Sequence, residues 1–143
     1  MLLNKINHVG IVVKNLQAAL NSYSGCLGIK VEKITEIPDV QLKIGVLKIG
    51  EVEVELLEYG NPELPIAKSL RADRAGLNHI CYEVEEFDLA LKNLKESGFI
   101  LVEGFPRKGV HGRIAFLIPP HSPEERIEIL EVEHKNEQIL ERA

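Results

Sequence analysis

The chain has 143 residues, a formal net charge of −5 and 45% hydrophobic residues, which is the size and composition of one folded soluble domain, 1–143. No apolar run approaches the roughly 20 residues that a bilayer requires, and no basic cluster offers the charge that attracts nucleic acid, so we expect neither a membrane nor a nucleic-acid partner. The N-terminus lacks an export signal, and Cys26 and Cys81 form no CxxC pair. We therefore expect a cytoplasmic protein with two buried thiols.

The first half of the chain is predicted to begin with a strand and a helix. The apolar run 6–13 is rich in β-branched residues, which favours a strand. Apolar side chains then recur at helical spacing, which indicates an amphipathic helix with its stripe at Leu16, Ala19, Leu20 and Tyr23. Three more strands are predicted over 29–34, 42–49 and 52–59. These elements form a first module, about 4–60.

The second half is predicted to follow the same order after a connector. Residues 61–76 start with turn residues and carry a short predicted helix, 66–70. The elements that follow are a strand over 77–84, a helix with its stripe at Phe87, Ala90, Leu91 and Leu94, and strands over 100–103, 113–118 and 127–132. They form a second module, about 77–133. The polar tail 134–143 is predicted to be a frayed helical turn.

An internal repeat relates the two modules. Residues 6–31 align without a gap on residues 77–102, an offset of 71 (77 minus 6). The helical stripes superpose, and the identical pairs include Asn7/Asn78, His8/His79, Val13/Val84, Ala19/Ala90, Leu20/Leu91, Ile29/Ile100 and Val31/Val102. We therefore predict an α+β fold in which two βαβββ modules form one domain, with a metal cleft between curved mixed sheets.

Each module offers one histidine and one glutamate at matching positions. His8 and His79 match in the first strands, and Glu55 matches Glu128 where VEVELLE aligns with ERIEILE in the last strands. Strand alternation places Glu55 on the same face as an apolar neighbour, and a carboxylate on an apolar face requires a cation. For any single carboxylate, the alternative is a solvated position on an exposed strand. The matched pairs favour convergence on a divalent metal ion between the modules.

Two imidazoles and two carboxylates suit one divalent ion per chain, such as Co²⁺, Mn²⁺, Ni²⁺ or Zn²⁺. An octahedral ion would keep two positions for substrate oxygens and stabilise an enolate formed by loss of the proton between them. Iron oxygenases use two histidines and one carboxylate, so four protein ligands argue against that reaction. The pattern predicts a proton-transfer enzyme.

The duplicated βαβββ order with His, Glu, His, Glu resembles the vicinal oxygen chelate superfamily over nearly the whole chain. Within it, the segments INHVGIVV, VELLE, RAGLNHICYEV, HGRIAFLIPP and IEILE look most like the methylmalonyl-CoA epimerase family. This resemblance implies that His8, Glu55, His79 and Glu128 are the metal ligands and that Glu128 also acts as an acid–base group. It further implies an acyl-CoA or related thioester substrate and a homodimer.

The second acid–base group of that family is a glutamate in an E-x-G-V context, and here the sequence departs from it. The matching position is Asp39 in PDVQL, sixteen residues before Glu55. Aspartate keeps the chemistry but is one methylene shorter, and small misplacements of a catalytic group can cost about a hundredfold in rate. The alternative is that Asp39 is only a turn residue after Pro38.

Two other functions within the superfamily remain open. A glyoxalase I-like lactoylglutathione lyase also moves a proton, but its pattern carries an arginine soon after the first ligand histidine, where this chain has Val9 and Gly10. A non-catalytic ligand-binding or resistance protein would have no need of four ligands. Separately, His111 and Arg113 are predicted either to place a cation at the cleft mouth or to form a surface turn.

Overall fold

The computed structural model describes residues 3–132, and the predicted tail 134–143 lies outside them. The first half consists of β1 (Leu3–Val12), α1 (Leu16–Leu20), a π-helical segment (Asn21–Cys26), β2 (Val31–Ile37), a 3₁₀ turn (Pro38–Val40), β3 (Leu42–Ile49) and β4 (Val52–Tyr59). The second half consists of α2 (Pro65–Ser69), β5 (Gly76–Val84), α3 (Phe87–Glu96), β6 (Ile100–Leu101), β7 (Arg107–Lys108), β8 (Gly112–Ile118) and β9 (Arg126–Val132).

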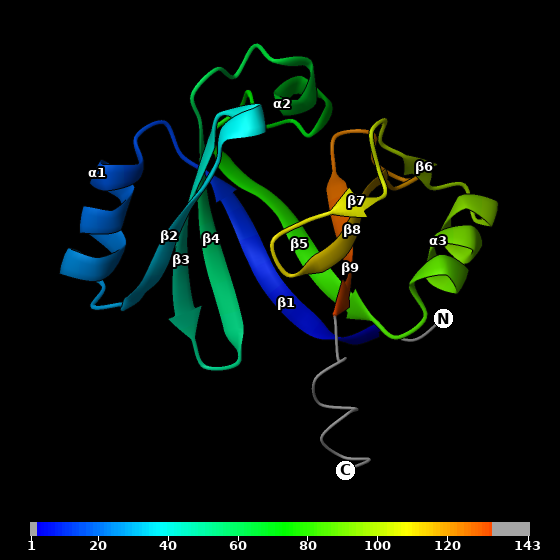
Figure 1. The fold of residues 1–143 in the computed structure, drawn as a ribbon, viewed down its shortest axis with the longest axis horizontal. Coiled ribbons are helices and arrows are strands. Elements are labelled where there is room, and N and C mark those ends of the chain that lie inside the picture. The colour runs from blue at the N-terminus through cyan, green and yellow to red at the C-terminus, as the bar shows by residue number, and fades with distance from the viewer. Residues whose placement is uncertain (1–2, 133–143) are drawn as a thin grey trace.

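The strands form one sheet with the order β2-β3-β4-β1-β5-β9-β8-β6, and β7 pairs with β8. Each half has the same internal pattern, because β1 runs parallel to β4 and β5 runs parallel to β9. The antiparallel pairing of β1 with β5 joins the halves at the centre (Figure 1). The α+β class and the repeated strand order are therefore confirmed.

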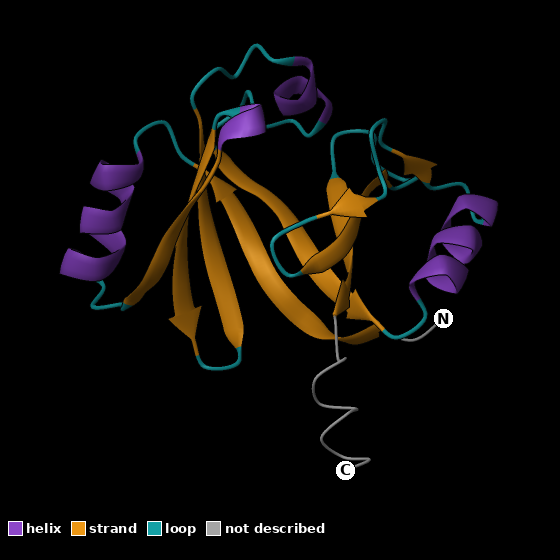
Figure 2. Ribbon diagram, viewed as in Figure 1, coloured by secondary structure: helices purple, strands orange, loops and turns teal. Residues whose placement is uncertain are grey.

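α1 and α3 lie outside the strands at opposite ends of the molecule, and α2 lies between these ends at the top of the view (Figure 2). In the first half, Leu16 and Leu20 of α1 pack with Leu47 and Leu56. In the second half, the apolar stripe of α3 packs against β8 and β9, in a cluster that includes Phe87, Ala90, Leu91, Leu94, Ala115, Leu117 and Ile129. No helix within residues 3–132 is long and apolar enough to cross a membrane.

Repeat-related glutamates on the outer face lie at the start of α1 and of α3. Glu58 Oε1 accepts a hydrogen bond of 2.7 Å from the backbone N–H of Leu16 at the start of α1. Its counterpart Glu131 acts through Arg113, whose guanidinium lies 3.1 Å from Glu131 and 3.0 Å from Asp88 in the first turn of α3. Glu58 and Glu131 thus lie on the outer faces of β4 and β9, whereas Glu55 and Glu128 lie on the inner faces of these strands.

Local details differ from the sequence predictions. The strand predicted over 100–103 ends at Leu101, because the chain turns at Gly104, where φ is 93°. The two-residue β7 has no apolar pattern to predict it and forms by backbone pairing with β8. Cys81 is buried as expected, but Cys26 is exposed at the end of the π-helical segment, so that prediction is wrong.

Candidate metal and proton-transfer site

Four adjacent strands at the centre of the sheet supply the predicted ligands. The β1–β4 register sets Gly10 beside Glu55, and the β5–β9 register sets Cys81 beside Glu128. In the β1–β5 pair, His8 is opposite Cys81, and Gly10 is opposite His79. This pairing brings the histidine and glutamate of each half to the same region of the inner face.

The four side chains are buried and close to one another. Their exposed fractions are 4% for His8, 7% for Glu55, 8% for His79 and 4% for Glu128. Glu128 Oε1 lies 3.1 Å from His8 Nε2 and 3.0 Å from His79 Nε2, and the two Nε2 atoms are 3.2 Å apart. Glu55 Oε1 lies 3.5 Å from His8 Nε2. The structure thus brings together all four residues that the sequence proposes as ligands.

This donor set fits a divalent metal ion. Glu128 Oε1 is buried and makes no hydrogen bond of acceptable geometry within the described residues. At metal–ligand bond lengths of about 2.1 Å, two ligands at right angles lie about 3 Å apart, which matches the separations among these three atoms. Imidazole nitrogens and carboxylate oxygens are ligands that first-row transition metals and Zn²⁺ accept. Cys81 lies in the same group of side chains, but burial raises the pKa of its thiol, which disfavours the thiolate.

The carboxylate of Glu128 and the imidazole of His8 shift each other's pKa. Burial raises the pKa of Glu128, but the adjacent imidazoles of His79 and His8 lower it by more, to about 2. Burial lowers the pKa of His8, but the carboxylates of Glu128, Glu55 and Glu53 raise it by more. The buried carboxylate is therefore ionised at neutral pH and is stabilised by a proton or a metal ion held on the nitrogens.

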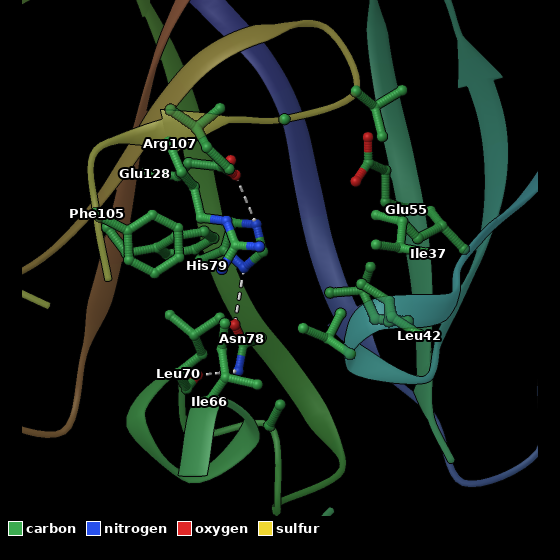
Figure 3. Close-up of a pocket in the computed structure, with 18 of the residues that line it drawn as sticks. Ile37, Leu42, Glu55, Ile66, Leu70, Asn78, His79, Phe105, Arg107 and Glu128 are labelled. Carbon is green, nitrogen blue, oxygen red and sulfur yellow. Dashed lines mark hydrogen bonds and ion pairs between the residues drawn. The ribbon is translucent and has the colours of Figure 1, made fainter. Parts of the chain in front are cut away.

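Beside the four residues, an apolar cavity opens between the two halves (Figure 3). One wall comes from the first half and includes Ile37, Val40, Leu42, Ile44 and Leu57. The other wall comes from α2 and the second half and includes Ile66, Leu70, Phe105, Ile114 and Leu130. His8, Glu55, His79 and Glu128 all line this space, so a ligand inside it would meet the polar cluster directly.

Asp39 is not brought to this cluster. It lies in the 3₁₀ turn between β2 and β3, and its side chain is exposed. Its neighbours Ile37 and Val40 line the cavity, but Asp39 itself is not among the lining residues. The residue predicted as the second acid–base group is therefore adjacent in sequence to cavity residues but is itself exposed and outside the cavity lining.

His111 is a cavity residue for which the sequence left two alternatives, and the structure places it at the cleft. Its Nε2 lies 3.5 Å from Glu55 Oε2 and 3.6 Å from Glu53 Oε1. The carboxylate of Glu55 raises the pKa of His111 by more than its partial burial lowers it. Glu53 is not among the ligands that the sequence proposes, although its spacing of two residues from Glu55 places both on one face of β4.

Because Gly10 has no side chain, the His79 ring can lie against its backbone. We therefore expect even a small side chain at residue 10 to have a large effect. A Cβ atom at Gly10 would lie 2.3 Å from His79 Cε1, so Gly10→Ala must displace the ring. We expect metal affinity to fall at least about tenfold, with a loss of about 1–3 kcal/mol in folding stability. Chelator competition and thermal unfolding measure the two effects. Gly25→Ala is the control, because nothing lies within 4 Å of its added Cβ; equal metal affinity in both variants would contradict the prediction.

Comparisons with known proteins show the family and the similarity of the fold. Residues 7–116 match the profile of the Glyoxalase/Bleomycin resistance protein/Dioxygenase superfamily. The chain is 35% identical to an ethylmalonyl-CoA/methylmalonyl-CoA epimerase of Cereibacter sphaeroides over 121 residues, which cover 83% of this chain and 90% of that protein. Methylmalonyl-CoA epimerase from Mycobacterium tuberculosis superposes with a TM-score of 0.78 at 25% identity, over 96% of this chain and 93% of that one. A Streptomyces coelicolor methylmalonyl-CoA epimerase variant in complex with 2-nitronate-propionyl-CoA has a TM-score of 0.77 at 25% identity, over 92% and 96% of the two chains.

Proposed function

The chain belongs to the glyoxalase/bleomycin resistance protein/dioxygenase superfamily, and we propose that within it the chain is an isomerase that epimerises the α-carbon of an acyl-CoA. The observation that carries this proposal is the convergence of two repeat-related His/Glu pairs, all buried, on one end of an apolar cavity. Such a site combines a group that can exchange a proton with a space that shields the reacting carbon from water.

The proposed substrate is methylmalonyl-CoA or a close 2-alkylmalonyl-CoA. The Cereibacter relative is named for ethylmalonyl-CoA and methylmalonyl-CoA, and a methylmalonyl-CoA epimerase of the same fold is known in complex with methylmalonyl-CoA. The α-carbon of these substrates carries a proton between two carbonyl carbons. The apolar walls suit its alkyl substituent, and the open end of the cavity leaves a path for the remainder of the thioester.

His8, Glu55, His79 and Glu128 would hold one divalent metal ion. When bound, the ion would supply Lewis-acid polarisation of the substrate oxygens. The residues themselves keep the site dry and fix its charge, because all four are buried and two of them are carboxylates. The identity of the metal among Co²⁺, Mn²⁺, Ni²⁺ and Zn²⁺ is left to measurement.

Glu128 is proposed to exchange the α-proton on one face of the substrate carbon. A carboxylate can accept and return a proton, and Glu128 lines the cavity that the substrate would occupy. Epimerisation needs a second group on the opposite face. We retain Asp39 for this role, which requires its carboxylate to turn inward past Ile37 and Val40. His111 is the structural alternative, since it already lines the cavity.

The decisive experiment measures hydrogen exchange at the α-carbon. Metal-loaded protein incubated with methylmalonyl-CoA in deuterated water is expected to introduce deuterium at that carbon and to interconvert the two epimers. A methylglyoxal–glutathione hemithioacetal assay run in parallel tests the glyoxalase I-like lyase. Activity in the second assay alone would replace the proposal by the lyase, and binding without turnover in either assay would favour a ligand-binding protein.

We also propose a homodimer and a cytoplasmic location.

A further inference from the structure

An asparagine precedes each proposed ligand histidine, and both asparagines contact the ring that follows. Asn7 Oδ1 lies 2.9 Å from His8 Nδ1, and Asn78 Oδ1 lies 2.7 Å from His79 Nδ1. The two asparagines occupy equivalent repeat positions. Figure 3 shows Asn78 between the His79 ring and Leu70, with a hydrogen bond drawn to each.

The partners on the other side of each amide determine which amide atom faces the imidazole. Asn7 Nδ2 donates a 2.9 Å hydrogen bond to Glu83 Oε2, and a carboxylate can only accept. Asn78 Nδ2 donates to the backbone carbonyl oxygens of Leu70, at 3.0 Å, and Arg71, at 3.2 Å, which also only accept. The amide nitrogens of both asparagines therefore donate to these acceptors and not to the histidine rings. Each amide oxygen must therefore face the histidine.

This orientation also determines which ring nitrogen carries hydrogen. An amide oxygen accepts hydrogen bonds, so Nδ1 of His8 and Nδ1 of His79 must be the donors. Nε2 is consequently the nitrogen that remains to bind a proton or a metal ion. The two Nε2 atoms are those that lie 3.2 Å apart and within 3.1 Å of Glu128 Oε1.

We propose that Asn7 and Asn78 are positioning residues that hold both imidazoles with Nε2 directed at the metal position. The inference rests on the metal site of the proposed function and adds two residues to it. A hydrogen bond to the far side of a ligand imidazole fixes the ring's rotation and raises its basicity, and loss of such a bond costs about 10- to 100-fold in metal affinity.

The two asparagines are anchored to different parts of the molecule. Asn7 is held by Glu83, whose carboxylate lies 3.7 Å from Lys5 Nζ near the surface. Asn78 is held by the turn that follows α2, and Leu70 in that turn lines the cavity. Asn78 therefore connects the cavity wall to a metal ligand, so its loss should also raise KM for the substrate, whereas loss of Asn7 should not.

Substitution of each asparagine by leucine tests the role without substrate. In Asn7→Leu and Asn78→Leu, chelator competition with Zn²⁺ is expected to show affinities about 10- to 100-fold below that of the unmodified protein. Asn4→Leu is the matched control, because Asn4 is an exposed residue of the same strand as Asn7, and its affinity should not change. Folded leucine variants that bind Zn²⁺ within about twofold of the unmodified protein would overturn the proposal.

A double substitution separates positioning from a general structural role. Asn7→Asp with Glu83→Gln exchanges the amide and the carboxylate, so residue 83 now donates to residue 7, which still accepts from His8 Nδ1. The double variant is expected to regain the Zn²⁺ affinity that Asn7→Leu loses, and no recovery would contradict the inference.

A second measurement uses the unmodified protein. ¹⁵N NMR should show hydrogen on Nδ1 of both ligand histidines, and hydrogen on Nε2 instead would contradict the inference. Failure of α-deuteration with normal Zn²⁺ binding would instead reject only the proposed reaction.

Discussion

Replacement of His79 by alanine is expected to reduce bound divalent metal from about one ion per chain to less than about a tenth of that amount. His79 Nε2 is one of three atoms that converge within 3.2 Å, so its removal leaves the Glu128 carboxylate with fewer partners and the metal with an incomplete ligand set. Metal analysis after desalting measures the loss. His121→Ala is the matched control, because His121 is exposed and pairs only with the nearby Glu125 among the contacts described.

The same site should contribute to folding stability through metal binding. A ligand that binds only the folded state stabilises it by about 2.7 kcal/mol when present at a hundred times its dissociation constant. Addition of a chelator should therefore lower the Tm of the unmodified protein by several degrees and change that of His79→Ala little. A folded His79→Ala protein that retains its full metal content, or a Tm insensitive to chelator, would rule out the proposed metal site.

Substitution of Glu128 by glutamine is expected to lower the rate of α-deuteration by about 10²- to 10⁴-fold, the usual contribution of a positioned acid–base group. Glutamine keeps the shape of the side chain but cannot accept the α-proton as a carboxylate does. Glu131→Gln is the control from the same strand, because Glu131 faces Arg113 on the outer side and lies outside the cavity. If Glu128→Gln retains the unmodified rate, Glu128 is not the proton-transfer group.

The deuteration assay also decides the position of the second acid–base group. If Asp39 serves the opposite face, Asp39→Asn should keep its metal and lose most epimerisation, whereas Asp39→Glu, with its extra methylene, should preserve or raise it. Unmodified rates in both Asp39 variants would remove this residue from the mechanism. The remaining candidate would then be His111, whose ring already lies in the cavity.

The internal repeat explains why so much of the core of the site could be predicted. His8 and His79 stand at equivalent positions of β1 and β5, and the shared strand order of the two halves makes their convergence a consequence of symmetry. Strand alternation correctly placed Glu55 on the inner face, where it is buried and lines the cavity. Both inferences need only the sequence periodicity and the pairing of equivalent strands.

Residues that are not repeated in both halves were harder to predict from the sequence. His111 lies in the turn between β7 and β8, and the corresponding turn between β2 and β3 holds no histidine, so the repeat did not point to its contact with Glu55. Asp39 lies in a 3₁₀ turn, where strand alternation gives no guide to which side chains face inward. The asparagines were visible as an identical pair, but their roles depend on acceptors such as Leu70 O that are eight residues away in sequence.

The His79 ring occupies the space beside Gly10 that a side chain would otherwise fill, and this makes the metal site of a duplicated fold asymmetric. The repeat-equivalent position of Gly10 is Cys81, which lies opposite His8 in the β1–β5 pair. A side chain at residue 10 would meet the His79 ring, whereas the structure accommodates Cys81 opposite His8. The two imidazoles are therefore not placed equivalently, although their positions in the repeat are equivalent. The glycine of one half and the cysteine of the other make the centre asymmetric, so the two histidines should differ in their tolerance of substitutions on the neighbouring strand.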